Sequence, residues 1–226
     1  MKHKLVAMFS VLVLGFSGTA YAASNSDFTQ TINAGVLLTD ILDASRVSVA
    51  SPSVAMSAVT TSFDCQYVGS GASTGTFGSN TERVYVSNPA AANNGWTLSV
   101  AATAGATATW DDGGTNSFDF NDPTGTNAGC TDGADTDALG GQLGLDPNAG
   151  TITTDCQSCS STGVTKGSAA SFDEGTTDSI TLINAASGSD DVWRGYLTDA
   201  GVDQTIPAET PAANYSINLT LTSVAN

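Results

Sequence analysis

Two stretches of the chain alternate large apolar residues with small polar ones, as half-buried β-strands do. In the first stretch, Trp96, Leu98 and Val100 occupy every second position. The second stretch, close to the end of the chain, has the same spacing at Tyr215, Ile217, Leu219 and Leu221. Side chains of a strand point alternately to opposite faces, so this period buries one face and leaves the other in water. We therefore predict core strands over residues 96–100 and 215–221.

Shorter apolar runs, separated by turn residues, predict the other strands. These runs cover residues 27–32, 46–50, 53–59, 82–87, 179–183 and 192–197. Residues 35–42 fit either a strand or a short helix, whereas the Gly/Ser-rich residues 69–75 predict a loop. Apolar alternation almost vanishes over residues 111–175, which are rich in Asp, Gly, Asn and Thr. We predict an all-β fold: an antiparallel β-sandwich over residues 23–226, with 111–175 as a long, loop-rich acidic insertion.

The first 22 residues have the parts of a secretory signal peptide. A basic start with Lys2 and Lys4 precedes an apolar run over residues 5–16, and Ala20-Tyr21-Ala22 forms a small-x-small cleavage site. The apolar run is shorter than the about 20 residues that a spanning helix needs, which argues against an uncleaved membrane anchor. We expect a secreted protein, extracellular or at the cell surface, without membrane insertion.

The composition of the chain after the signal narrows its function. Four basic residues and all 22 acidic residues remain, a net charge of 4 − 22 = −18, so nucleic acid and anionic lipid are poor partners. The only histidine, His3, lies in the signal, which excludes Ser-His-Asp and Cys-His catalysis from the remaining residues. Lys166 lies in a predicted loop, and the scattered carboxylates identify no acid/base pair. We predict that the protein is not an enzyme.

Cysteines and acidic clusters are the remaining candidates for special chemistry. Four cysteines in an exported chain predict disulfides with three possible pairings, and a four-thiolate zinc site or free thiols are the alternatives. These cysteines are Cys65, Cys130, Cys156 and Cys159. Calcium takes about six to eight oxygen ligands, which acidic loops supply; a solvated acidic surface is the equal alternative. The candidate calcium ligands are Asp111, Asp112, Asp119, Asp122, Asp132, Asp135 and Asp137.

Residues 94–100 (Asn-Gly-Trp-Thr-Leu-Ser-Val), together with a Pro-rich turn and a terminal alternating strand over residues 207–222, resemble the WxL domain of bacterial surface proteins. The first Trp-x-Leu motif is present at Trp96 and Leu98. The second is degraded, because Leu219 stands where its Trp is expected. The resemblance implies a secreted β-sandwich that associates non-covalently with the peptidoglycan of the cell wall or with other surface proteins.

Two non-enzymatic functions follow from these observations. The first is docking on cell-wall polymer, with Trp96, Leu98, Trp110 and Trp193 as candidate contacts; for Trp96 we favour a place in the core over stacking on a glycan. The second is self-assembly as a structural subunit of an extracellular filament or surface layer, because unpaired edge strands are templates for pairing with another chain. A secreted hydrolase that uses acidic residues is the least favoured.

Overall fold

The structure, a computed structural model, describes residues 29–90, 93–123, 127–133, 138–189 and 192–226. The predicted signal peptide therefore lies outside the described residues. The chain divides into two units, Met1–Asn33 and Ala34–Asn226. In the first unit, the described residues 29–33 form neither helix nor strand. All strands described belong to the second unit. No helix among the described residues is long and apolar enough to span a membrane.

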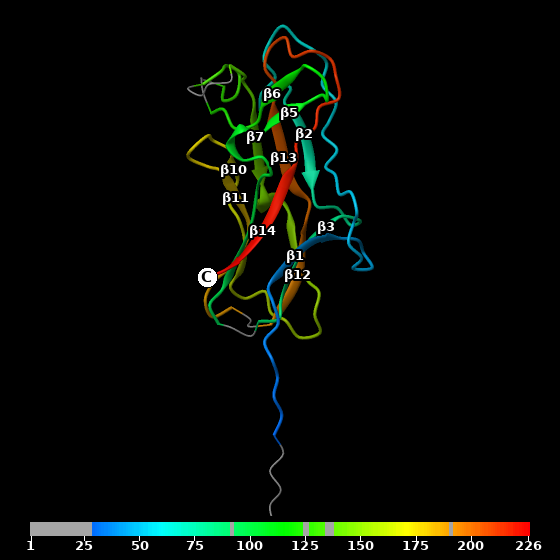
Figure 1. Ribbon diagram of the computed structural model, residues 1–226, viewed down its shortest axis with the longest axis vertical. Helices are drawn as coiled ribbons and strands as arrows, with labels where there is room; N and C mark the ends of the chain where they lie inside the picture. Colours follow the sequence, from blue (N-terminus) through cyan, green and yellow to red (C-terminus); the bar gives the residue numbers. More distant parts are fainter. Residues whose placement is uncertain (1–28, 91–92, 124–126, 134–137, 190–191) are drawn as a thin grey trace, which may run out of the picture. The chain divides into compact units, whose positions relative to one another are not determined.

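One layer of the second unit is formed by two four-stranded sheets that continue into each other (Figure 1). The first sheet has the order β1-β3-β12-β8 and the second the order β10-β7-β13-β2, and all neighbours are antiparallel. Their bounds are β1 Leu38–Leu42, β2 Ser73–Phe77, β3 Arg83–Asn88, β7 Gln142–Asp146, β8 Thr151–Thr154, β10 Ala170–Ser171, β12 Trp193–Thr198 and β13 Ala200–Thr205.

The chain passes from one sheet of this layer to the other at three places: between β2 and β3, between β7 and β8, and between β12 and β13. These three breaks lie next to one another. Asp199, at φ 61°, is the only residue between β12 and β13. Its N–H donates to the carbonyl of Gly78, in the break between β2 and β3, at 2.7 Å. The break between β7 and β8 contains the short 3-10 helix η2 (Pro147–Ala149) and Gly150, at which a Cβ would lie 2.5 Å from the carbonyl oxygen of Thr198. The layer therefore continues across the breaks.

The second layer is one antiparallel sheet in the order β14-β4-β11-β9. Its bounds are β4 Trp96–Ala102, β9 Val164–Lys166, β11 Ser179–Ala185 and β14 Leu219–Ala225, and a hairpin of β5 (Thr109–Asp111) and β6 (Ser117–Asp119) follows the 3-10 helix η1 (Gly105–Thr107). Trp96, Leu98 and Val100 of β4 are at most 1 % exposed, as their alternation predicts. The core lies between the layers, and the all-β, antiparallel sandwich-like fold is confirmed.

Several local predictions were wrong. The predicted strand 27–32 is not formed over the described residues 29–32. Residues 46–50 and 53–59 contain a single bridge, between Leu42 and Ser48, instead of strands. The predicted loop 69–75 contains the start of β2, whose small polar residues carry no apolar pattern but pair along β13. Of residues 35–42, which fit either a strand or a helix, residues 38–42 form the strand β1.

The segment 111–175 contributes more to the sandwich than a loop-rich insertion would. Its strands β7, β8 and β9 pair with β13, β12 and β11, which follow in the sequence. Six of its apolar side chains are buried in the core: Phe118, Phe120, Leu143, Leu145, Val164 and Phe172. Pairing across the whole chain forms these strands, although their sequences alternate too weakly to reveal them.

Candidate functional site

The most distinctive surface feature of the second unit is a groove along β14, the edge strand of the second layer. The side chains of Ile217, Leu219 and Leu221 point toward the core but are only half-buried, whereas the residues between them are exposed. On the neighbouring strand β4, the corresponding apolar side chains are buried completely. One side of the sandwich is therefore left partly open.

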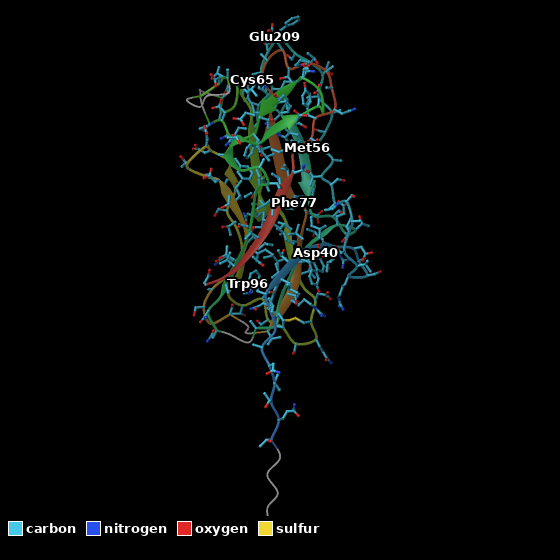
Figure 2. The ribbon with its side chains drawn as sticks, viewed as in Figure 1. Asp40, Met56, Cys65, Phe77, Trp96 and Glu209 are labelled. Atoms are coloured by element: carbon cyan, nitrogen blue, oxygen red, sulfur yellow. A yellow bond between two sulfur atoms is a disulfide. The ribbon has the colours of Figure 1, made fainter. Side chains whose placement is uncertain are left out.

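Two cavities form this groove. The first, of about 330 Å³, lies between the β14 side and the β1–β2 side, with Val100, Leu143 and Leu145 of the core among its lining residues. The second, of about 700 Å³, extends between the segment 54–62 and residues 206–215. Both cavities are lined by Val54, Met56, Trp110 and Tyr215, and Figure 2 labels Met56 together with Phe77, which lines the smaller one. The shared lining makes them one continuous groove, and the smaller cavity is lined mainly by apolar side chains.

The wall opposite β14 is an irregular segment, residues 52–62, held by a few specific contacts. Ser57 N–H donates to the carbonyl of Thr74 in β2 at 2.6 Å, and the hydroxyl of Ser73 donates to the carbonyl of Ser57 at 2.6 Å. A disulfide between Cys65 and Cys130 lies just beyond the segment. It joins the chain after the wall to the distant loop after β6, so the wall is held at its middle and beyond its C-terminal end without belonging to a sheet.

An aromatic cluster closes one end of the groove. Trp110 of β5 stacks on Phe118 of β6 with ring centroids 5.9 Å apart, and Tyr215 packs edge-on against Phe118 at 4.9 Å. The indole N–H of Trp110 donates to the side-chain oxygen of Gln204, which is buried in β13, at 2.7 Å. Burial, and then the negative charge of Asp112, raise the pKa of Tyr215 above its ordinary value. This end is amphipathic, with apolar ring faces beside hydrogen-bonding groups.

Three of the four residues expected to contact wall polymer lie in the core. Trp96, Leu98 and Trp193 are at most 1 % exposed, and the rings of the two tryptophans pack 5.2 Å apart. Side chains buried to this degree cannot stack on a glycan, so in the present fold they are packing residues, and this corrects Leu98 and Trp193 as candidate contacts. Trp110 is half-buried and is the one expected contact residue that lines the groove.

The acidic residues expected to bind calcium are not gathered into one site. Asp111 and Asp112 accept hydrogen bonds from their own turn, from the N–H groups of Gly113 and Gly114 at 2.6 and 2.7 Å. The hydrogen bond that Asn116 donates lowers the pKa of Asp112. Asp119 and Asp122 are buried, Asp132 is exposed, and Asp135 and Asp137 lie outside the described residues. Within the described part of the chain, no three acidic, cysteine or histidine residues form a metal-binding group.

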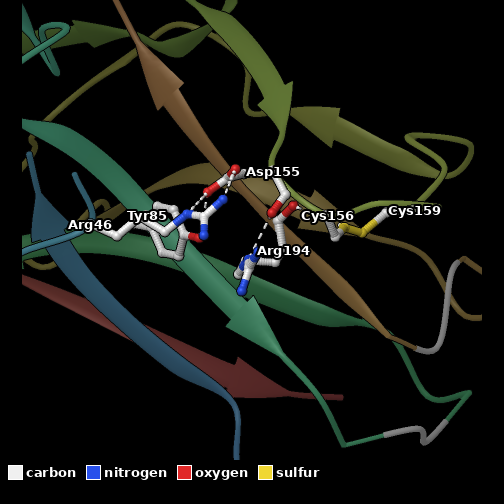
Figure 3. The surroundings of a disulfide bond; sticks show 6 residues. All are labelled: Arg46, Tyr85, Asp155, Cys156, Cys159 and Arg194. Carbon is white, nitrogen blue, oxygen red and sulfur yellow. Dashed lines mark hydrogen bonds and ion pairs between the residues drawn. A yellow bond between two sulfur atoms is a disulfide. The ribbon is translucent and has the colours of Figure 1, made fainter. Parts of the chain in front are cut away.

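The second disulfide, Cys156–Cys159, adjoins an ionic cluster that crosses the outer face of the first sheet (Figure 3). Arg46, after β1, reaches Asp155, after β8, with two hydrogen bonds of 2.5 Å. The hydroxyl of Tyr85 in β3 donates to the same carboxylate at 2.8 Å, and the side chain of Arg194 in β12 donates to the backbone carbonyl of Asp155 at 2.7 Å. The arginine holds the pKa of Asp155 below its ordinary value. The cluster thus links both edges of this sheet. The two cysteines beside it form a disulfide.

Comparison of the chain with models of protein families, with curated proteins and with solved structures gave no match. The resemblance to the WxL domain therefore stays a prediction. The groove itself was not predicted from the sequence. Two features of the sequence contribute to it: the alternation of residues 215–221, which overlaps the start of β14, and the apolar residues Val54 and Met56, in a segment that was wrongly predicted to be a strand.

Proposed function

We propose that the protein is an exported structural subunit that assembles with other copies through β-strand pairing at the open side of the sandwich. The observation that carries this proposal is the groove beside β14, where an edge strand, a half-buried apolar face and an apolar cavity coincide. A strand added there would satisfy the outer backbone groups of β14 and bury its apolar side chains together.

The backbone hydrogen bonds identify which groups of β14 are available for pairing. Asn218 accepts from the N–H of Thr103 at 2.9 Å, and the N–H of Asn226 donates to the carbonyl of Gly95 at 3.1 Å. Backbone groups of alternate residues in an antiparallel strand point to the same neighbour, so the even-numbered residues of β14 face β4. The odd-numbered residues, Leu219, Leu221 and Ser223, therefore direct their N–H and carbonyl groups toward the outer edge.

Self-assembly explains this geometry better than docking on wall polymer does. Of the four candidate contacts for wall polymer, Leu98 and Trp193 are buried in the core, as is Trp96, for which the core was the favoured place. Disulfides and the predicted signal peptide support a role outside the cytoplasm for either function. Calcium binding stays a prediction from the sequence, and the described residues form no metal-binding group.

The test is sedimentation velocity and electron microscopy of residues 23–226 before and after tenfold dilution. We expect polymers that persist on dilution. Ser223→Pro should reduce them to single chains, because proline removes an outward N–H without removing a hydrogen bond to β4; Ser223→Ala is the matched control and should assemble. A single-chain species at every concentration would contradict the proposal. Pelleting only with purified sacculi, and never alone, would favour wall docking instead.

A further inference from the structure

We infer that the strand added to β14 is the N-terminal segment of a second copy, residues 29–36, and this inference rests on the proposed function. In this arrangement the apolar side chains of the segment enter the groove between β14 and the irregular wall, residues 52–62. Each copy then acts as donor at one end and as acceptor at the other.

The donor segment has the pattern of a strand but does not form one. Every second residue from Phe28 to Val36 would share one face of an extended chain, and this face carries Ile32 and Val36. Ile32 is 89 % exposed and Val36 is 70 % exposed, and residues 29–37 contain no helix or strand. Alternating apolar residues that stay in water are a cost that pairing with a partner strand removes.

The charge distribution favours burial of this segment. The sequence has 22 acidic residues, yet residues 28–39 contain no charged residue at all. Burying a charge without a partner is costly, so an uncharged segment can enter an apolar groove without that penalty. The matching wall, residues 52–62, is also uncharged. Repulsion between two acidic copies remains, and added salt should weaken that repulsion and promote assembly.

Gly35, near the end of the donor segment, and the groove lie at opposite ends of β3, which favours exchange between copies. Gly35 N–H donates to the carbonyl of Pro89 at 2.9 Å, just past the C-terminal end of β3. Gly35 also packs so tightly on Pro89 that a Cβ would lie 2.4 Å from its ring. Glu82, Phe77 and Gly78, which line the groove, lie just before the other end of β3. Donation from one end to the opposite end of the next copy is a head-to-tail contact, which propagates without closing on itself unless the rotation closes a ring.

The lengths of the two partners are compatible. Extended residues rise about 3.3 Å each, so the seven residues of β14 cover about 23 Å and the eight residues 29–36 cover about 26 Å. Ile32 would then lie near the middle of the paired region. Residues 23–28 remain in front of it after the predicted cleavage.

The experiment compares two neighbouring substitutions, Ile32→Asp and Thr31→Asp, in the otherwise intact chain of residues 23–226. Both introduce one carboxylate in the same segment, but only residue 32 faces the groove. We expect the Thr31→Asp variant to form polymers and the Ile32→Asp variant to remain as single chains. The empty groove of Ile32→Asp should bind one labelled peptide with the sequence of residues 27–37, and the same peptide with Asp at position 32 should bind at least about 30-fold more weakly.

The outcomes separate this inference from the proposed function. If the wild type and Ile32→Asp both form polymers that Ser223→Pro abolishes, strand pairing at β14 stands and the donor assignment is wrong. If no variant forms polymers, the proposed function and the inference both fail. A single-chain wild type whose Ile32 amide is protected from hydrogen exchange would place the segment in its own groove and overturn exchange between copies.

Discussion

The two sides of the sandwich are closed to different degrees, although the same two layers form both. On the β9 side, Val164 is 8 % exposed and Phe172 is fully buried, and Lys166 donates hydrogen bonds to the carbonyls of Asn148 and Gly150 in the opposite layer. On the β14 side, Leu219 and Leu221 are half-buried beside a cavity. The first side is completed by side chains of its own chain, and the second has the features of a side that another strand completes.

The difference arises from where the chain places its aromatic and long side chains. The segment 111–175 brings Phe120 and Phe172 together, with ring centroids 5.1 Å apart, and supplies Lys166 to the same side. The segment that covers the β14 side, residues 52–62, has only Val54, Met56 and Val59 as larger apolar residues. Small residues cannot fill the space between two layers, so a groove remains.

Phe172→Ala should give the largest loss of stability, because it opens the closed side. Phe172 is 0 % exposed and packs on Phe120, and replacing a buried phenylalanine by alanine costs about 3–5 kcal/mol. Urea unfolding of the single-chain Ser223→Pro background measures this loss without interference from assembly. An exposed apolar residue on the same background, Val192→Ala, is the control and should change stability by less than about 0.5 kcal/mol. Similar losses for both would contradict a closed β9 side.

Removal of the Cys65–Cys130 disulfide should have the next largest effect, and it should act on the open side. The bond spans 65 residues and ties down the wall of the groove, so the double substitution to serine should cost about 2–4 kcal/mol. A looser wall should also weaken binding of the donor peptide. The control is the double substitution of Cys156 and Cys159 to serine. Their disulfide joins residues only 3 apart in the sequence, so its removal should leave peptide binding unchanged. Equal effects of the two on the peptide would contradict the role of the wall.

The same substitution, leucine to alanine, made at a fully buried and at a half-buried position compares the closed core with the open side directly. Leu182 of β11 is 0 % exposed and should lose about 2–5 kcal/mol, whereas half-buried Leu219 should lose about 1–2 kcal/mol in the single chain. In polymers the loss caused by Leu219→Ala should be larger than in the single chain, because pairing buries this side chain. Hydrogen exchange of β14 amides, compared between Leu219→Ala and the wild type in single chains and in polymers, measures this increase. A Leu219 effect that is the same in both states would argue against pairing at this edge.

The sequence predicted the central strands well and the sides poorly. Trp96, Leu98 and Val100 alternate and are buried, because β4 lies between two neighbours and one of its faces meets the core. The strands β2 and β13 were missed, because Ser, Thr and Gly residues there pair through the backbone, which leaves no apolar pattern. The groove could not be predicted, because it depends on which segments of the chain come to face each other. The most informative wrong prediction is the strand over residues 27–32: the sequence alternates as in a strand, but the described residues 29–32 do not form one.

The smallest expected effect concerns the cluster of Arg46, Tyr85, Asp155 and Arg194, which joins the β1 edge to the β8 edge on the outer face. Burial, followed by the hydrogen bond to Asp155, raises the pKa of Tyr85 to about 12. Because the pKa in the folded state lies above the value of about 10 in the unfolded state, this stabilisation is complete below pH 10 and is lost as the pH rises toward 12. The lowered pKa of Asp155 acts at the other extreme: its contribution is present above about pH 4 and is lost as the pH falls through the folded value.

Tyr85→Phe tests this cluster, because it removes the ionisable hydroxyl and leaves the ring. We expect a loss of about 1 kcal/mol at pH 7, together with a smaller decline in stability between pH 10 and 12 than in the wild type. Thermal unfolding of both proteins across this range measures the decline. Assembly at pH 7 should be unaffected, since the cluster lies on the outer face and the groove between the layers at β14. A variant that loses polymers while its single chains stay folded would mean that contacts between copies also involve this face, and the open side would then be only part of the interface.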